Sequence, residues 1–366
     1  MARIGKISRP FLIWTILLVV AGFFIFSSAS LGVLARDEIK FSSVAFKQIF
    51  YGLFLGTVAC VIFARVDYHV WRKISFWFFV GSTILTLFVF IPGIGMEHGG
   101  AHRWIDLKFI SFQPSEILKV SFVIYFAAWL SGIKKRVDTF KWGLLPFIIF
   151  SSIVGIVLLA QPDTDTFAVT MFAGLAMYIT AGAKWKHIGA IVLGGIVILA
   201  GLAFTRPYVM QRIKTLVDPS ANSQTTGYQL QQSLIAVGSG EMWGRGFGQS
   251  VQKFSYLPEP IGDSVFAVAA EEFGFVGAFL LIAGFIMFSI EGLKVAGRAP
   301  DDFGRLLSVG IVILIISQAM VNIGGIIGIL PLTGIPLPFV SHGGTALLIN
   351  LIEVGIVMNI SRQAKK

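Results

Sequence analysis

The chain has 366 residues, of which 55% are hydrophobic and 13% are charged, and its mean hydropathy is +0.82. These values exclude an ordinary water-soluble domain and predict a protein that lies mostly in lipid. The formal net charge of +10 implies no nucleic-acid partner, because Lys and Arg accumulate in the cytoplasmic loops of membrane proteins. The single cysteine, Cys60, excludes a disulfide within the chain.

Ten apolar runs are long enough to cross a hydrocarbon core, which takes about 20 helical residues. The runs are continuous rather than alternating, which predicts helices and not a barrel. In chain order they are 10–34, 46–64, 74–91, 115–132, 142–160, 166–183, 187–205, 264–290, 305–330 and 344–361. We therefore expect an all-α polytopic membrane protein with about ten transmembrane helices. The chain 1–366 forms one integral membrane domain in this interpretation, with a large outer loop, 206–262, between helices 7 and 8.

Lys and Arg are concentrated in the loops on one side of these spans. The short loops on the side of the amino terminus are the most basic per residue, and they include Arg65, Arg72, Lys73, Lys134 and Arg136. The positive-inside rule then predicts a multi-pass protein of the cell membrane with both termini in the cytoplasm.

The unusual loops all fall on the opposite, outer side. They are "PGIGMEHGGAHRWIDLKFISFQPSE" (92–116), "QPDTDT" (161–166), the segment 206–262 and "PLTGIPLPFVSHGGT" (331–345). Loops that a rigid scaffold positions often carry function. Their convergence predicts a site at the outer membrane surface, open to a substrate whose tail stays in lipid.

Asp263 stands where a polar loop, "YLPEPIG", enters the eighth apolar run. One interpretation is an N-cap, in which the carboxylate accepts a backbone N–H and complements the helix dipole. The other is a catalytic carboxylate that acts as a general base or as a metal ligand. The two roles are compatible with each other.

The outer motifs also resemble a known family. "GAHRWI" and "FQPSEILK", then "QPDTDT", "GYQLQQSLIAVGSGEMWGRGFGQSVQKFSYLPEP", "AEEFGFVG" and "GILPLTGIPLPFVSHGG" resemble, in order and spacing, the SEDS family of bacterial cell-wall polymerases, the FtsW and RodA proteins. The segment "SVQKFSYLPEP" is more similar to FtsW, the division member, than to RodA, the elongation member.

This resemblance implies a peptidoglycan glycosyltransferase that joins lipid II units into glycan strands at the outer face of the cytoplasmic membrane. It implies a class B penicillin-binding protein as partner, and lipid II and the polyprenyl-diphosphate-linked glycan as substrates. It also places the family's essential acid at Asp263, with Mg or Mn as a possible divalent cofactor bound there. The chain differs from the usual family sequence at His102, Asp165, "IGDSVF" and "SHGGT". Some of its substrate contacts are therefore expected to differ from those of the family.

Four outer cations are candidates for binding the substrate diphosphate: Arg103, Lys119, Arg206 and Arg212. Guanidinium groups match phosphate geometry. Glu116 lies three residues before Lys119, so these two residues either neutralise each other on one helix face or contact substrate. Arg206 and Arg212 have a second interpretation as interfacial anchors that extend toward lipid headgroups.

Three further features have both a structural and a functional interpretation. Ser341 opens the last helix, whose N-terminus either holds a substrate anion or forms a tight glycine turn. The Asp-x-Asp of "PDTD" (162–165) is either a metal site or a turn with a helix cap. Glu271 and Glu272 are either a structural pair or residues that shape the cavity beneath Asp263.

Two rival function classes remain. A lipid-linked precursor transporter, or flippase, would place ionisable groups near the midplane of internally repeated halves. A non-enzymatic division scaffold would not need Asp263. No clear repeat is visible, and the candidate site residues gather at one surface, which favours a one-sided enzyme.

Overall fold

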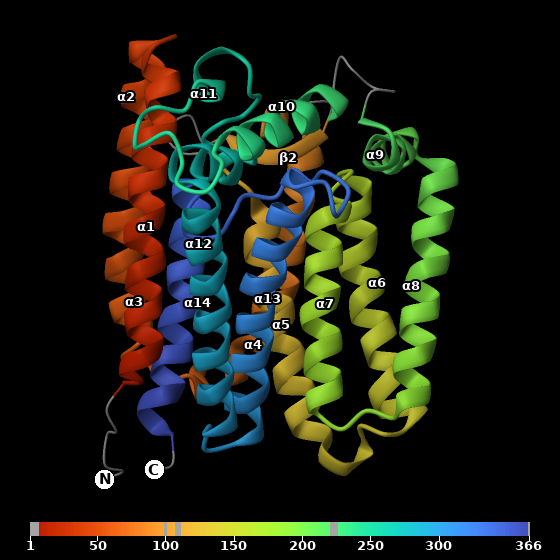
Figure 1. Ribbon diagram of the computed structural model, residues 1–366. Coiled ribbons are helices and arrows are strands. Elements are labelled where there is room, and N and C mark those ends of the chain that lie inside the picture. Colours follow the sequence, from red (N-terminus) through yellow and green to blue (C-terminus); the bar gives the residue numbers. More distant parts are fainter. Residues whose placement is uncertain (1–6, 99–100, 107–110, 220–225, 365–366) are drawn as a thin grey trace.

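The computed structural model describes residues 7–98, 101–106, 111–219 and 226–364. Long helices stand side by side, and the described part of the chain begins and ends at the same end of the bundle, where the Ser8 amide donates to Ser361 Oγ (Figure 1). The helices are α1 (Arg9–Leu34), α2 (Glu38–Phe46), α3 (Gly56–Phe63), α4 (His69–Leu87), α5 (Pro114–Ile133), α6 (Leu145–Ala160), α7 (Thr164–Thr180), α8 (Trp185–Thr205), α9 (Pro207–Val217), α10 (Thr226–Ser239), α11 (Gln252–Ser255), α12 (Val265–Gly297), α13 (Asp302–Ile326) and α14 (Gly344–Gln363). The π-helical segments are η1 (Lys47–Leu55) and η4 (Phe140–Leu144), and short 3-10 turns are η2 (Phe88–Phe90) and η3 (Lys134–Arg136).

The helical membrane fold is confirmed. Within the described ranges, nine helical stretches are long and apolar enough to cross a membrane. The remaining predicted span, 166–183, corresponds to α7, which has 17 residues. Two spans are less regular than their apolar runs suggest. The second span of the chain begins at Glu38 and passes through the π-helical segment η1. Helix α12 is interrupted at Gly274, whose φ is +66°.

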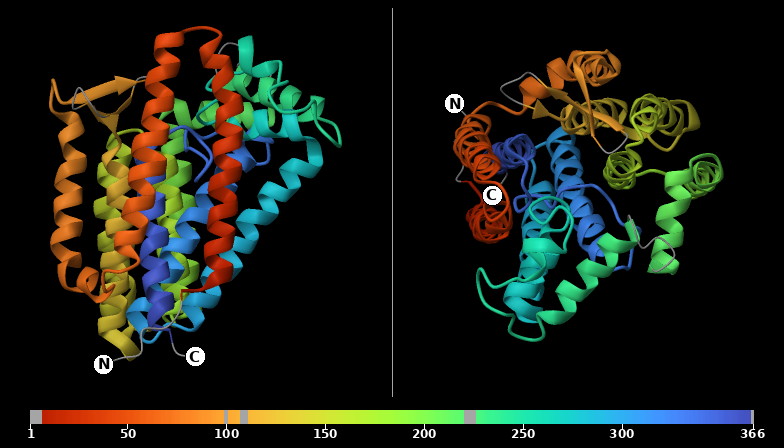
Figure 2. Two further views of the ribbon diagram at one scale, coloured as in Figure 1. Left: turned by 90° about the vertical axis from the view of Figure 1, so that its left-hand side faces the viewer. Right: turned by 90° about the horizontal axis from the view of Figure 1, so that it is seen from above.

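The core of the bundle is built around α13. This helix packs against α5, α7, α12 and α14, because it is apolar on nearly every side. In contrast, α8 stands at the periphery beside α9 when the molecule is seen from above (Figure 2). Most of its apolar side chains are exposed, among them Leu193, Ile196, Val197 and Phe204. The fold thus combines a packed centre with one weakly attached span.

The segment 92–116, which was expected to be a loop, contains a small antiparallel sheet. Strand β1 (Gly95–His98) pairs with β2 (Ala101–Asp106), which pairs with β3 (Ser111–Phe112). Met96 lies opposite Trp104 and Glu97 opposite His102, which leaves Arg103 as an extra residue in β2. Such a bulge bends its strand and redirects the side chain next to it.

The segment 206–262 is also more ordered than a plain loop. It contains α9, α10 and α11, which lie at the end of the bundle opposite the termini, as β2 does (Figure 1). Helix α10 packs on α12 and α13, and α11 packs on α1. The unusual loops therefore share one end of the molecule, as their sequence positions predicted.

The two glutamates of α12 hold part of this segment in place. Glu272 Oε1 accepts hydrogen bonds from Lys253 Nζ and Ser28 Oγ, both at 2.6 Å. Glu271 accepts from Ser250 Oγ at 2.5 Å and from the Val251 amide at 3.0 Å. All of these contacts are within the protein, so the structural interpretation of the two glutamates accounts for their burial.

Candidate active site

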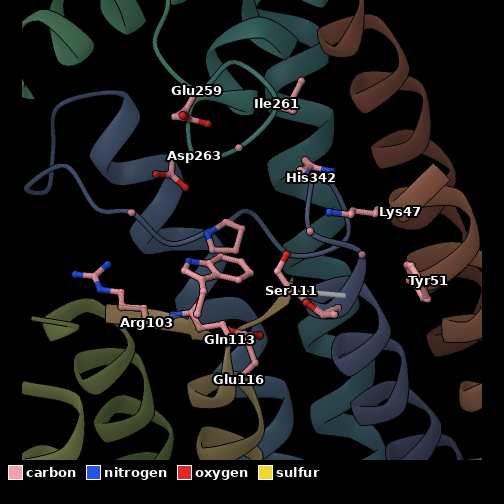
Figure 3. Close-up of a pocket in the computed structure, with 18 of the residues that line it drawn as sticks. Lys47, Tyr51, Arg103, Ser111, Gln113, Glu116, Glu259, Ile261, Asp263 and His342 are labelled. Carbon is pink, nitrogen blue, oxygen red and sulfur yellow. The ribbon is translucent and has the colours of Figure 1, made fainter. Parts of the chain in front are cut away.

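A cavity of about 390 Å³ opens between the outer motifs. Its walls come from η1, from the sheet, and from the loops that precede α12 and α14 (Figure 3). Asp263 and Arg103 lie toward one end, and Lys47 and Tyr51 lie toward the other. The polar lining includes Lys47, Arg103, Gln113, Glu116, Glu259 and Asp263.

Asp263 faces this cavity and does not cap α12. The helix begins at Val265, its N-cap position is Ser264, and no side chain forms a cap hydrogen bond there. The backbone around Asp263 is fixed instead by neighbouring side chains. Asn322 Nδ2 donates to the Asp263 carbonyl at 2.9 Å, and Ser341 Oγ donates to the Gly262 carbonyl at 2.8 Å. The N-cap interpretation was therefore wrong, because Asp263 lies one residue too early.

The electrostatic surroundings of Asp263 favour proton exchange near neutral pH. Burial, and then the negative charges of Glu259 and Asp165, raise the pKa of Asp263 to about 7, although Arg212 and Arg103 act in the opposite direction. Among the residues that the structure describes, none donates a hydrogen bond to its carboxylate. A carboxylate with this pKa, facing a cavity, suits general-base catalysis.

Glu259 lies beside Asp263 at the mouth of the cavity (Figure 3). Its φ of +46° is left-handed, which is uncommon for a residue with a side chain. The Glu259 carbonyl accepts hydrogen bonds from the amides of Gly262, at 3.1 Å, and Ser264, at 3.2 Å. This tight turn brings the two carboxylates together, and the strained backbone is compatible with a functional role.

Arg103 is the bulged residue of β2, and its guanidinium is held by two backbone carbonyls. Its Nε donates to the Gln161 carbonyl at 3.2 Å, and Nη2 donates to the Pro162 carbonyl. A Cβ at Gly334 would stand 3.6 Å from Asp263 Oδ2 and 3.9 Å from Arg103 Nη1. The glycine thus leaves open space between the acid and the cation.

The two acids of "PDTD" have separate partners. Asp163 caps α7 by accepting from the Thr166 amide at 3.4 Å, and it also accepts from Gln113 Nε2 at 3.2 Å. Burial raises the pKa of Asp163, and the positive charge of Arg103 opposes this effect. Asp165 accepts from Arg212 Nη1 at 2.8 and 2.6 Å. The helix-cap interpretation is confirmed for Asp163.

Glu116 and Lys119 form a buried ion pair of 2.8 Å. Lys119 Nζ also donates to Gln318 Oε1 at 2.7 Å. Glu116 lines the cavity, whereas Lys119 lies behind it and is not part of the lining. The ion-pair interpretation is confirmed, and direct contact between Lys119 and substrate stays a prediction.

Arg206 and Ser341 lie outside the cavity lining. Arg206 is exposed at the junction of α8 and α9. Ser341 is buried, and its hydroxyl accepts from the Leu337 amide at 2.8 Å while it donates to the Gly262 carbonyl. These contacts tie the "SHGG" loop to the Asp263 loop. Substrate contact by either residue stays a prediction, and for Ser341 a positioning role is the simpler account.

Several cavity residues were missed by sequence reasoning. Lys47 and His342 face each other at the end of the cavity away from Arg103 (Figure 3). Burial and the charge of Lys47 lower the pKa of His342 to about 4, so its ring is neutral at pH 7. A lysine at the outer end of an apolar run was the available signal for Lys47, but such residues are usually interfacial anchors. Trp104 and Gln113 lie within the outer motifs, without a feature that singled them out.

The site has the donors for a divalent ion that binds together with a phosphate. No group of three His, Cys, Asp or Glu side chains converges in the described parts of the chain. Asp263 and Glu259 supply two carboxylates, and Mg²⁺ is commonly held by one or two carboxylates plus substrate phosphate oxygens. The residues present fit that kind of site, not a cage made by the protein alone.

Comparison with known proteins decides the family. Residues 9–366 match the FtsW, RodA and SpoVE family of cell cycle proteins. The chain belongs to this family. Over 356 residues it is 35% identical to stage V sporulation protein E of Bacillus subtilis, covering 97% of this chain and 96% of that protein. It is 39% identical over 323 residues to a probable peptidoglycan glycosyltransferase FtsW of Geobacter sp. strain M18, covering 87% of each chain.

Solved structures show the same fold. A chain from a study titled "Structural coordination of polymerization and crosslinking by a peptidoglycan synthase complex" matches with a TM-score of 0.80 at 24% identity, over 97% of this chain and 98% of that one. The rod shape determining protein RodA of Thermus thermophilus matches with a TM-score of 0.71 at 23% identity, over 98% of both chains. The FtsW/RodA/SpoVE architecture is therefore shared over nearly the whole length.

Proposed function

We infer that this chain polymerises the glycan strands of peptidoglycan from lipid II. The observation that carries the inference is Asp263, a cavity carboxylate with a pKa raised to about 7 and with Arg103 across an open gap. Family membership and relatives that are named peptidoglycan glycosyltransferases support the same activity. The proposed polymerase acts in cell division or in cell elongation.

The reaction requires a base and a way to stabilise a departing anion. A sugar hydroxyl of the acceptor attacks the anomeric carbon of the donor, a glycosidic C–O bond forms, and the bond to the diphosphate breaks. Asp263 takes the proton of the attacking hydroxyl. Arg103 lies where a positive charge can stabilise the diphosphate as it leaves.

A divalent ion is part of this proposal. Mg or Mn, held by the carboxylates of Asp263 and Glu259 and by substrate phosphate oxygens, would supply further positive charge to the diphosphate. Asp263 keeps its role toward the acceptor hydroxyl, and Arg103 keeps its role toward the diphosphate.

The substrate enters from lipid in this proposal. The cavity lies at the end of the bundle opposite the termini, so cytoplasmic termini place it at the outer leaflet. A polyprenyl chain would then remain in the bilayer while its diphosphate reaches Arg103. Because Arg206 lies at the outer end of a span, it is available to meet the same lipid-linked glycan.

The proposed partner is a class B penicillin-binding protein, which crosslinks the strands. Its single transmembrane helix would pack on the spans near 264–330, and its outer domain would rest on 206–262. Helix α13 is largely covered by this chain itself, whereas α12 exposes apolar side chains. The exposed residues of α12 include Phe275, Phe279, Leu280, Ile286 and Ile290.

One experiment separates this proposal from its rivals. Purified protein is incubated with lipid II and Mg or Mn, with and without the penicillin-binding partner, and the products are separated on a gel. We expect glycan polymer. A flippase would instead move lipid II between the leaflets of a vesicle without polymer, and a scaffold would do neither.

A further inference from the structure

Asp165 and Arg212 form an ion pair next to Gly334, which lines the cavity, although neither Asp165 nor Arg212 is itself part of the lining. Arg212 Nη1 donates to both carboxylate oxygens of Asp165, at 2.8 and 2.6 Å. The side chains are 10% and 20% exposed, so the pair is shielded from most solvent. Arg212 belongs to α9 and Asp165 to the first turn of α7. The contact therefore joins an outer helix to the transmembrane bundle.

The Asp165 carboxylate is held in place by the neighbouring residue of α7 and by the loop that precedes α14. Thr164 Oγ1 donates to Oδ1 at 3.2 Å, and the Gly334 amide donates to Oδ2 at 3.3 Å. Gly334 is also the residue that separates Asp263 from Arg103. The Asp165 carboxylate therefore lies close enough to Asp263 for its negative charge to raise the pKa of that residue, and it is hydrogen-bonded directly to Arg212.

The negative charge of Asp165 disfavours the ionised form of Asp263, since carboxylates close together repel each other. A guanidinium group binds carboxylates and phosphates through the same N–H donors. Arg212 Nη1 is already engaged by Asp165, so an incoming phosphate has to compete for it.

We propose that Asp165 is a built-in competitor of the substrate diphosphate for Arg212. The carboxylate occupies the guanidinium when no substrate is bound, and the diphosphate displaces it. Asp165 thereby weakens diphosphate binding and keeps α9 docked on α7 between binding events. The identity of the ligand rests on the proposed function, whereas the competition between anions does not.

The test uses the full-length protein in detergent and inorganic pyrophosphate as the probe, with binding measured by calorimetry. Asp165→Asn removes the charge and keeps an acceptor for the Gly334 amide. We expect its Kd for pyrophosphate to fall about tenfold, because a charge-assisted hydrogen bond no longer competes. Asp165→Glu keeps the charge and should bind nearly as the parent does.

The matched control is Asp138→Asn, which removes a carboxylate from the exposed pair with Lys184 and should leave the Kd unchanged. Adding Arg212→Gln to Asp165→Asn should abolish the gain. Asp165→Ser, which is smaller and uncharged, repeats the comparison if Asp165→Asn folds poorly. An unchanged or higher Kd in a folded, uncharged variant overturns the proposal.

The polymerase function and the competition for Arg212 can be refuted independently of each other. If the parent makes no polymer from lipid II but pyrophosphate binds more tightly to Asp165→Asn, the competition stands and the polymerase function fails. If the parent polymerises lipid II but the variants bind pyrophosphate no better, only the competition is refuted.

Discussion

The carboxylate of Asp263 is exposed to opposing influences. Burial, Glu259 and Asp165 favour its neutral form, and Arg212 and Arg103 favour its ionised form. The balance places its pKa near 7, so small changes in the neighbouring charges alter the fraction that can accept a proton. This sensitivity makes the pH dependence of the reaction informative.

We predict that kcat/KM for lipid II rises with pH through an apparent pKa of about 7, because a base must be ionised to act. Asp165→Asn removes a neighbouring negative charge that raises this pKa and that belongs to no proposed metal ligand, so the rise should move to lower pH. A pH–rate series on both proteins measures this. A rise centred near 4 in the parent would contradict the assignment.

The raised pKa of Asp263 also makes the stability of the protein depend on pH. Since the pKa of Asp263 in the folded protein lies above the ordinary value of 3.8 for an aspartate, its contribution to stability is fully present below about pH 4 and is lost as the pH rises through about 7. Asp263→Asn should therefore remove this part of the pH dependence of the melting temperature. An unchanged dependence would show that the pKa is not raised.

Glu116 and Lys119 allow a test of pairing against chemistry. Either single reversal, Glu116→Lys or Lys119→Glu, leaves like charges together at a buried site and should lower the melting temperature strongly. The double reversal should recover much of that loss. Because Glu116 lines the cavity, we expect polymerisation to remain impaired in the double variant. Full recovery of activity would refute a direct role for either residue.

Among the elements, the segment that precedes α12 is held by the hydrogen bonds of Glu271 and Glu272 to Ser28, Ser250, Val251 and Lys253, which we call the clamp. Lys253 is fully buried and its ammonium is bonded to Glu272 and Ser28. Removing one member of such a pair leaves a buried charge without a counter-ion. The order of this outer segment is therefore expected to depend on one ion pair.

We predict that Glu272→Gln lowers the free energy of unfolding by about 3 kcal/mol and speeds proteolysis within 244–256. The control is Glu291→Gln, which breaks the Lys294–Glu291 pair, where Lys294 is exposed. That change should cost less than about 1 kcal/mol. Equal effects of the two substitutions would show that the clamp does not stabilise the segment.

On the scale of the whole molecule, the exposed apolar surfaces differ between the two sides of the bundle. Helix α12 presents an apolar face while its other residues pack on α1, α10 and α13. Helix α8 exposes most of its apolar side chains and packs chiefly on α9. We therefore propose that the partner helix packs on α12 and that α8 faces lipid.

This assignment predicts a crosslinking pattern. In a Cys60→Ser background, cysteines introduced at Phe279 and Ile286 should be trapped by cysteines in the partner's transmembrane helix. Cysteines at Leu193 and Ile196 of α8 serve as controls and should not react with it. If only the α8 positions form crosslinks, the docking face is wrong.

Much of the fold was predictable from the sequence because lipid imposes a simple rule on span length and polarity. The grouping of the outer motifs followed from counting spans, and Asp263 and Arg103 do meet at one cavity. Details that depend on one residue of register were not predictable. Examples are the bulge at Arg103, which needs the pairing of β1 with β2, and the helix start that leaves Asp263 just before the N-cap.

Contacts between residues that are far apart in the sequence were not predictable either. Arg212 lies 47 residues from Asp165, and only the fold brings them together. Lys47 reaches the cavity because η1 lies against the loop before α14. Local sequence indicated cations at the same end of the spans as Asp263, but it did not indicate which of them face the cavity.

The most direct test of the account is the activity of Asp263→Asn on lipid II. The substitution keeps the size of the side chain and removes the base and its charge, and Asp263 forms no helix cap, so the variant should fold and should melt no lower than the parent. We predict that its polymerisation rate at saturating Mg or Mn falls by about 10² to 10⁴, measured as glycan polymer on a gel. A folded Asp263→Asn protein that polymerises lipid II at the parental rate would contradict the catalytic role of Asp263.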